Sequence, residues 1–118
     1  MSLKVHCYLR TLRRGWGLTQ EEVAALLPKA SHTRVSRVER ELVSPNAGEI
    51  IAYGLIFGLP ASKIFARFQA KIEEVVVEHS YRLHKRVEGD ETRLGRRKRE
   101  LTEKMLARAI VHTKRHNV

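Results

Sequence analysis

Polar and basic side chains between positions 31 and 40 are of the types that could recognise a ligand. Val35 and Val38 are spaced by three residues, as expected for the buried side of one helix. The remaining side chains can form hydrogen bonds or ion pairs: His32, Thr33, Ser36 and Arg37 on the outer face, with Arg34 flanking it. Imidazole, hydroxyl and guanidinium groups on an exposed helix suit hydrogen bonding to base edges in the major groove of DNA. We therefore interpret the stretch from about Ser31 to Arg40 as a groove-binding helix.

The sequence offers no support for catalysis, a cofactor or a metal site. Histidines and carboxylates are scattered, without nucleophile–base spacing, a glycine-rich phosphate loop or a metal-ligand cluster. His112 and His116 have the i, i+4 spacing of a metal pair, but no carboxylate or cysteine nearby completes a site. The single cysteine, Cys7, excludes an internal disulfide and fits a small core residue. We expect a binding protein rather than an enzyme.

Composition points to a polyanionic partner. The 118 residues are 42% hydrophobic, which is enough for a folded core, and they include 23 Lys and Arg against 13 Asp and Glu. The formal net charge is +10, and neutralisation of DNA phosphates by such cations releases counterions and supplies affinity. Nucleic acid is the first partner to consider, although an acidic protein or an anionic membrane surface would also fit the charge.

No segment predicts a membrane or secretory location. The N-terminus has no apolar signal region, and the longest uncharged run, Ile50–Ser62, is too short to span a bilayer. We expect a cytoplasmic protein that does not bind membranes.

Apolar periodicity predicts an all-α chain. Two stop signals, Gly15-Trp16-Gly17 and Pro28, and two capping hydroxyls, on Thr19 and Ser31, divide its first part into three helices. The expected helices cover about 3–14, 19–27, 31–40 and 47–57, followed by a long fifth helix from Ser62 to about Val87 and a last helix at about 91–112. We place a domain boundary between residues 66 and 67, where a five-helix bundle would be complete.

These elements resemble the Cro/phage-repressor (XRE-type) helix-turn-helix family over about residues 9–65. The matching segments are LRTLRRGWGLTQEEVAALL, SHTRVSRVERE and SPNAGEIIAYGLIFGLPASKIF. The chain departs from the family in two places: the turn Leu27-Pro28-Lys29-Ala30-Ser31 is one residue longer, and Glu41 replaces a common glycine. The resemblance implies a five-helix repressor-type DNA-binding bundle in residues 1–66. Residues 67–118 would then be a C-terminal helical extension that dimerises.

The resemblance also implies roles for individual residues. His32, Thr33 and Arg37 match positions that contact bases, and an Arg at the last position could pair with guanine N7 and O6. Phosphate contacts are expected from a second set, which is Gln20, Arg34, Ser36 and Arg40. Arg13 and Glu39 match a buried ion pair between the first and third helices of some family members. We interpret those two residues as scaffold.

The function expected on this basis is a sequence-specific transcriptional regulator, most simply a repressor. It would bind a palindromic operator in double-stranded DNA as a homodimer, because one recognition helix reads only a few base pairs. One alternative is an antitoxin-like interaction module whose C-terminal helices bind a partner protein. A weaker alternative is RNA binding through the basic C-terminal helices, where the run Arg96-Arg97-Lys98-Arg99 lies. That run fits a solvated helix face equally well.

Overall fold

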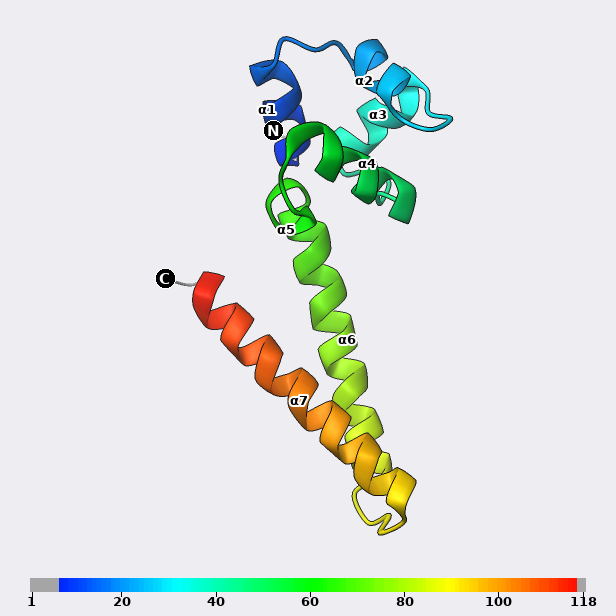
Figure 1. Cartoon of the computed structure of the whole chain (residues 1–118), viewed down its shortest axis with the longest axis vertical. Coiled ribbons are helices and arrows are strands. Elements are labelled where there is room, and N and C mark those ends of the chain that lie inside the picture. Colours follow the sequence, from blue (N-terminus) through cyan, green and yellow to red (C-terminus); the bar gives the residue numbers. More distant parts are fainter. Residues whose placement is uncertain (1–6, 117–118) are drawn as a thin grey trace, which may run out of the picture. The chain divides into compact units, whose positions relative to one another are not determined.

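The structure is a computed structural model that describes residues 7–116, with side chains through residue 111. Over these residues it is all-helical, as predicted, and has no strand. The helices are α1 (Tyr8–Gly15), α2 (Gln20–Leu26), α3 (His32–Glu39), α4 (Ala47–Phe57), α5 (Ala61–Ile64), α6 (Ala66–Arg86) and α7 (Arg93–His116) (Figure 1). They form two compact units, Met1–Gln69 and Ala70–Val118. No helix among the described residues is long and apolar enough to cross a bilayer.

Side-chain caps fix the starts of three helices in the first unit. Thr19 Oγ1 accepts a hydrogen bond from the Glu22 N–H, and the Glu22 carboxylate accepts one from the Thr19 N–H, which completes the capping box expected for α2. Ser31 caps α3 by accepting from the Arg34 N–H at 3.2 Å. Asn46 and Glu49 form a second reciprocal capping box at α4. These caps satisfy N–H groups that have no partner inside the helix.

The core of the first unit draws on every helix from α1 to α5. Its least exposed hydrophobic side chains are Leu9, Val23, Val35, Val38, Tyr53, Ile64 and Phe65. Tyr53 contacts Phe65 edge-on, with ring centroids 5.7 Å apart. Cys7 is also buried, as predicted, and its N–H donates to the Glu39 carbonyl at 2.9 Å. The N-terminal start of α1 is therefore fixed against the end of α3. The expected beginning of this helix at Leu3 lies outside the described residues.

The prediction of one long fifth helix from Ser62 is wrong. The chain breaks at Phe65, where φ is −122° and ψ is 49°, so that a short α5 precedes α6. Ile64 and Phe65 are both buried in the core of the first unit, and Phe68, which follows the break, also packs against that core. The periodicity of the sequence is continuous across the break and therefore could not reveal it.

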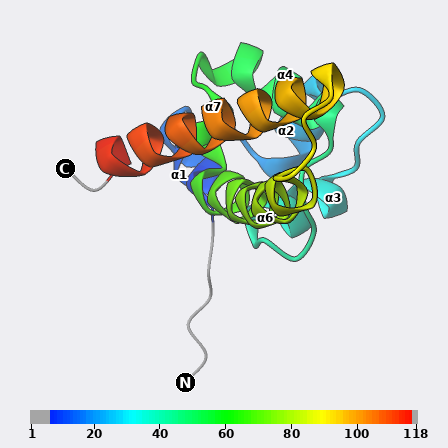
Figure 2. The same ribbon diagram turned by 90° about the horizontal axis from the view of Figure 1, so that it is seen from below.

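The second unit is an antiparallel hairpin of α6 and α7. The helices lie side by side near the turn that joins them and diverge toward their other ends (Figures 1 and 2). Small or β-branched side chains on the inner sides, Ser80, Val87 and Thr102, are buried near the turn. Gly95 has no room for a side chain, since a Cβ there would lie 2.6 Å from the Asp90 carbonyl oxygen. Arg99 closes the turn by donating to the Val87 carbonyl at 2.8 Å and to the Asp90 carbonyl.

Candidate nucleic-acid interface

The outer face of α3 presents the three residues predicted to contact bases. Val35 and Val38 are buried, whereas His32, Thr33 and Arg37 are exposed. His32 and Thr33 occupy the first turn of α3, and Arg37 follows about one turn later. Their exposure agrees with the prediction that Val35 and Val38 form the buried side of this helix. The three side chains therefore occupy the exposed part of one short helix.

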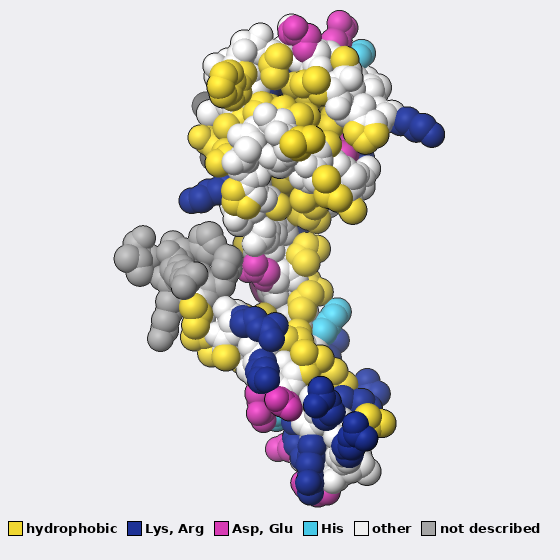
Figure 3. Space-filling model, in the orientation of Figure 1, with side chains coloured by type: hydrophobic (Ala, Val, Ile, Leu, Met, Phe, Trp, Pro, Cys, Tyr) yellow, Lys and Arg dark blue, Asp and Glu magenta, His cyan; other side chains and the backbone are white. Residues whose placement is uncertain are grey.

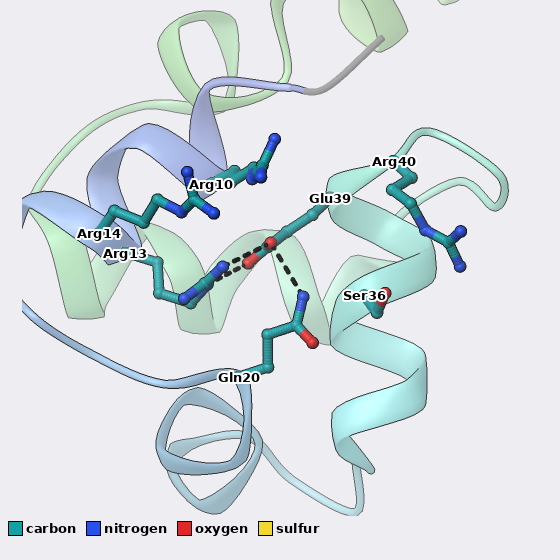
Figure 4. A pocket seen from close by; sticks show the side chains of 7 residues that line it. All are labelled: Arg10, Arg13, Arg14, Gln20, Ser36, Glu39 and Arg40. Atoms are coloured by element: carbon teal, nitrogen blue, oxygen red, sulfur yellow. Dashed lines mark hydrogen bonds and ion pairs between the residues drawn. The ribbon is translucent and has the colours of Figure 1, made fainter. Parts of the chain in front are cut away.

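A cationic pocket of about 540 Å³ lies beside α3 in the first unit. Three helices line it: α1 with Arg10, Arg13 and Arg14, α2 with Gln20, and α3 with Ser36, Glu39 and its C-cap residue Arg40 (Figure 4). Three of the four residues predicted to contact phosphate therefore lie together, namely Gln20, Ser36 and Arg40. The fourth, Arg34, is not among the lining residues.

The base of this pocket is a buried ion pair between α1 and α3. Arg13 Nε donates to Glu39 Oε2 at 2.6 Å, and its Nη2 donates to Glu39 Oε1 at 3.1 Å. The side chains of Arg13 and Glu39 are only 11% and 1% exposed. A third guanidinium nitrogen donates to the Leu18 carbonyl, and the Gln20 side-chain amide donates to Glu39 at 3.2 Å. This pair confirms the predicted scaffold, and Gln20 extends it to the start of α2.

The pocket has a surplus of positive charge. Its lining holds four guanidinium groups and one carboxylate, that of Glu39, which forms an ion pair with Arg13. Arg14 and Arg40 are exposed, and Arg10 is half-buried. Guanidinium groups offer planar sets of N–H donors that fit phosphate oxygens, and the Ser36 hydroxyl adds a neutral donor. The lining therefore suits an anion of the phosphate type.

Sequence reasoning missed Arg10 and Arg14 as members of this site. Their i, i+4 spacing was the available signal, since it places both on one side of α1. Only the packing of α1 against α3 shows that this side borders Ser36 and Arg40.

Arg34 has a different environment from the other predicted phosphate contacts. Its Nε and Nη2 donate to the Glu49 carboxylate at 3.0 and 2.6 Å, and Nη2 also donates to the Ser44 carbonyl. Glu49 is buried, and hydrogen bonding from Arg34 lowers the pKa of its carboxyl below its usual range. Arg34 therefore ties α3 to α4. A contact between Arg34 and a phosphate stays a prediction. Two of the three guanidinium nitrogens of Arg34, Nε and Nη2, already have partners within the protein.

Two non-glycine residues adopt left-handed backbone conformations, one before and one after α3. Lys29, in the turn between α2 and α3, has φ of 49°, and Glu41, just after α3, has φ of 58°. The Glu41 N–H bonds to the Val38 carbonyl and the Leu42 N–H bonds to the Arg37 carbonyl, which is the Schellman pattern of a helix end. Glu41 thus takes a conformation that a glycine would adopt more easily.

Among the described residues, no group of three or more His, Cys, Asp or Glu side chains is arranged to hold a metal ion. The pair His112 and His116 lies outside the described side chains.

Comparison with known proteins adds no relative, because no family model, curated protein or solved structure matches this chain.

Proposed function

We propose that the protein is a sequence-specific DNA-binding transcriptional regulator, acting as a repressor, whose helix α3 enters the major groove. The observation that carries this proposal is the cationic pocket beside the exposed face of α3. It supplies a phosphate-binding surface next to the side chains that could read bases. Protein–DNA interfaces combine these two kinds of contact, since phosphate contacts fix the register and base contacts supply the sequence preference.

In this mechanism, His32, Thr33 and Arg37 contact base edges. Arg37 is the strongest candidate for specificity, because a bidentate Arg–guanine pair contributes about 1–3 kcal/mol of discrimination. A backbone phosphate occupies the pocket, where Arg14, Arg40 and the Ser36 hydroxyl donate to its oxygens. Arg13 and Glu39 hold the angle between α1 and α3, so that the phosphate contacts and the base contacts keep a fixed spacing.

A homodimer on a palindromic operator completes the proposal. One helix the length of α3, eight residues, reads only a few base pairs, and a two-fold dimer doubles the site.

Selection of bound sequences from a random duplex library is the first test. We expect an enriched palindromic motif, with a half-site spacing of one helical turn or a multiple of it. Salt-sensitive binding to every sequence, without enrichment, would contradict the proposal of sequence specificity.

Two arginine variants separate the two kinds of contact. Arg37→Ala should weaken binding to the selected site more than binding to scrambled DNA at fixed salt. Arg14→Ala should weaken both about equally and reduce the slope of log K against log salt by about 1, as expected for one lost phosphate contact. Lys63→Ala is the matched control, since Lys63 is an exposed cation of the same unit outside the pocket lining. Equal effects of Arg14→Ala and Lys63→Ala would refute the pocket as a phosphate site.

A further inference from the structure

The positive charge of the second unit is concentrated at the turn of its hairpin. Residues 79–99 carry 8 Lys and Arg against 3 Asp and Glu, whereas the rest of the unit, residues 70–78 and 100–118, carries 5 of each kind. The formal charge is therefore +5 around the turn and zero over the remainder. Figure 3 shows Lys and Arg side chains gathered toward the turn, on the face in view.

Contacts within the hairpin account for only some of these cations. Arg82 pairs with Glu78, while Arg96 and Arg99 lie 3.5 and 3.7 Å from the Glu91 carboxylate. Four other exposed cations form no hydrogen bond or ion pair with any described residue, and these are Lys85 and Arg86 of α6 and Arg93 and Arg97 of α7. We call these four side chains the cationic tip.

The cations of α7 stand where helix electrostatics disfavour them. Arg93 begins the helix, Arg97 follows one turn later, and the first turn contains no acidic residue. The N-terminal end of a helix carries the positive end of the macrodipole, which repels cations. The helix end itself is already capped, since Thr92 Oγ1 accepts a hydrogen bond from the Gly95 N–H at 3.1 Å. Arg93 and Arg97 therefore do not serve the stability of α7, and an external anion would supply the counter-charge that they lack.

The cationic tip has two opposite sides. On α6, both of its members follow the buried Ser80 by about one and a half turns, so they face away from α7. On α7, Arg93 and Arg97 lie about half a turn before and after the buried Gly95, so they face away from α6. A partner that neutralises both sides must present negative charge in two places.

The phosphate strands of a nucleic-acid duplex meet this requirement, because one strand borders each side of a groove. An anionic lipid surface is flat and would contact one side of the tip at a time. Single-stranded nucleic acid is bound largely by stacking of bases on aromatic side chains, and Tyr81 is the sole aromatic residue in the sequence of the second unit. The placement of the cations and the side-chain chemistry therefore favour a duplex.

We propose that the cationic tip is a second DNA-binding surface, which contacts the two phosphate strands beside a groove and reads no bases. Its members are Lys and Arg side chains alone, and contacts of cations with phosphates carry no sequence information. The choice of DNA as the duplex rests on the proposed function, whereas the surface itself does not depend on α3. The tip would add affinity and salt dependence to binding on any sequence.

The first test measures the affinity of the full-length protein for a scrambled DNA duplex at several salt concentrations. Lys85→Gln with Arg93→Gln removes one cation from each side of the tip. This double variant should bind at least about tenfold more weakly at 0.1 M salt, and the slope of log K against log salt should fall by about 2, as expected for two lost phosphate contacts. Neither side chain has a partner among the described residues, so the thermal midpoint should not decrease.

Lys71→Gln with Arg108→Gln is the matched control. It also removes one exposed Lys from α6 and one exposed Arg from α7, and both double variants lower the formal net charge from +10 to +8. Lys71 precedes Lys85 by fourteen residues, about 20 Å along the helix, which exceeds the screening length of about 10 Å at 0.1 M salt. The control should keep its affinity within about twofold. Equal losses in the two double variants would overturn the proposal, because net charge alone would then explain them.

A background variant separates this surface from the pocket beside α3. In an Arg14→Ala protein, the Lys85→Gln and Arg93→Gln changes should cause the same loss in log K as in the wild type, because independent sites contribute additively. Disappearance of this loss would show that both sets of changes act on one site and would overturn a second surface. The loss is measured on scrambled DNA and does not require an enriched motif, so failure of sequence recognition by α3 and failure of the tip are separate results.

Two other polyanions test the choice of partner. The full-length protein should bind a DNA duplex more tightly than lipid vesicles that contain phosphatidylserine, and at least as tightly as an RNA duplex of the same length. Tighter binding to the RNA duplex or to the vesicles, lost in the Lys85→Gln and Arg93→Gln double variant, would overturn the assignment of the tip to DNA.

Discussion

Replacing Glu39 by glutamine should destabilise the protein strongly, although it changes only one oxygen into an NH₂ group. The Glu39 carboxylate is 1% exposed and accepts two hydrogen bonds from Arg13 and one from Gln20. Glutamine would leave the Arg13 guanidinium, 11% exposed, without its counter-charge. Removing one partner of a buried pair typically costs about 3–5 kcal/mol, because a buried charge remains uncompensated. We expect a loss of about 3 kcal/mol in the free energy of unfolding, measured by urea denaturation at pH 7.

The chain contains a matched control for this experiment. Arg82 Nη2 lies 2.6 Å from Glu78 Oε1, the same separation as between Arg13 Nε and Glu39 Oε2. The Arg82 and Glu78 side chains are 68% and 62% exposed, however, and exposed i, i+4 pairs contribute only about 0.3–0.5 kcal/mol. Glu78→Gln should therefore change the stability about tenfold less than Glu39→Gln. Equal losses in the two variants would refute the argument from burial.

A double replacement separates the buried charge from the packing. Arg13→Met with Glu39→Leu removes both charges and keeps apolar volume between α1 and α3, and such replacements are often neutral or stabilising. We expect this double variant to be more stable than Glu39→Gln. The same variant should lose DNA affinity if the ion pair sets the geometry of the pocket. A double variant less stable than Glu39→Gln would show that the pair contributes a net attraction larger than its desolvation cost.

Three further predictions concern stability. Tyr53→Phe should raise the free energy of unfolding by about 1 kcal/mol, because Tyr53 is fully buried and its hydroxyl has no hydrogen-bond partner among the described residues. A lower free energy of unfolding for this variant, measured by urea denaturation, would reveal a partner for the hydroxyl. Glu41→Gly should stabilise the folded protein by roughly 0.5–1 kcal/mol, since relief of the left-handed strain at φ of 58° exceeds the added entropy of the unfolded chain. An unchanged urea denaturation midpoint would argue against such strain. Glu49 has a lowered pKa in the folded state, chiefly through its hydrogen bond from Arg34. Its ionised carboxylate therefore contributes to the stability of the folded protein above about pH 4.3, the ordinary glutamate value, and this contribution is lost as the pH falls through the lowered folded pKa. The stability difference between wild type and Glu49→Gln should accordingly be larger at pH 7 than at pH 3, and a difference independent of pH would contradict this assignment.

Local signals predicted α2, α3 and α4 well. Thr19 with Glu22, and Ser31, mark helix starts because a side-chain acceptor three residues before a free N–H is a short-range feature. The spacing of Val35 and Val38 likewise identified the buried side of α3, and with it the exposed face that carries Arg37. Such features depend on residues within one or two turns of each other and can be read from one sequence.

Long-range packing accounts for what the sequence did not reveal. The break at Phe65 interrupts an apolar stripe that is continuous in the sequence, so periodicity alone cannot detect it. The partner of Arg34 is Glu49, fifteen residues away, and the pocket places Arg10 and Arg14 beside α3 through the packing of separate helices. Residue types indicated which side chains were cationic. Only the tertiary contacts distinguish a cation that binds a neighbouring helix from one that lines a pocket.

The reactivity of the Cys7 thiol can report local opening of the junction between α1 and α3. This thiol is 8% exposed at the junction of α1 with the end of α3, and burial raises its pKa. A thiol in this state reacts with a labelling reagent mainly when the junction opens, so the labelling rate reports the fraction of time that α1 is detached from α3. Because Cys7 is the single cysteine of the chain, this rate needs no engineered label. A phosphate analogue or DNA that binds the pocket between these helices should slow the labelling, which converts occupancy of the site into a measurable rate.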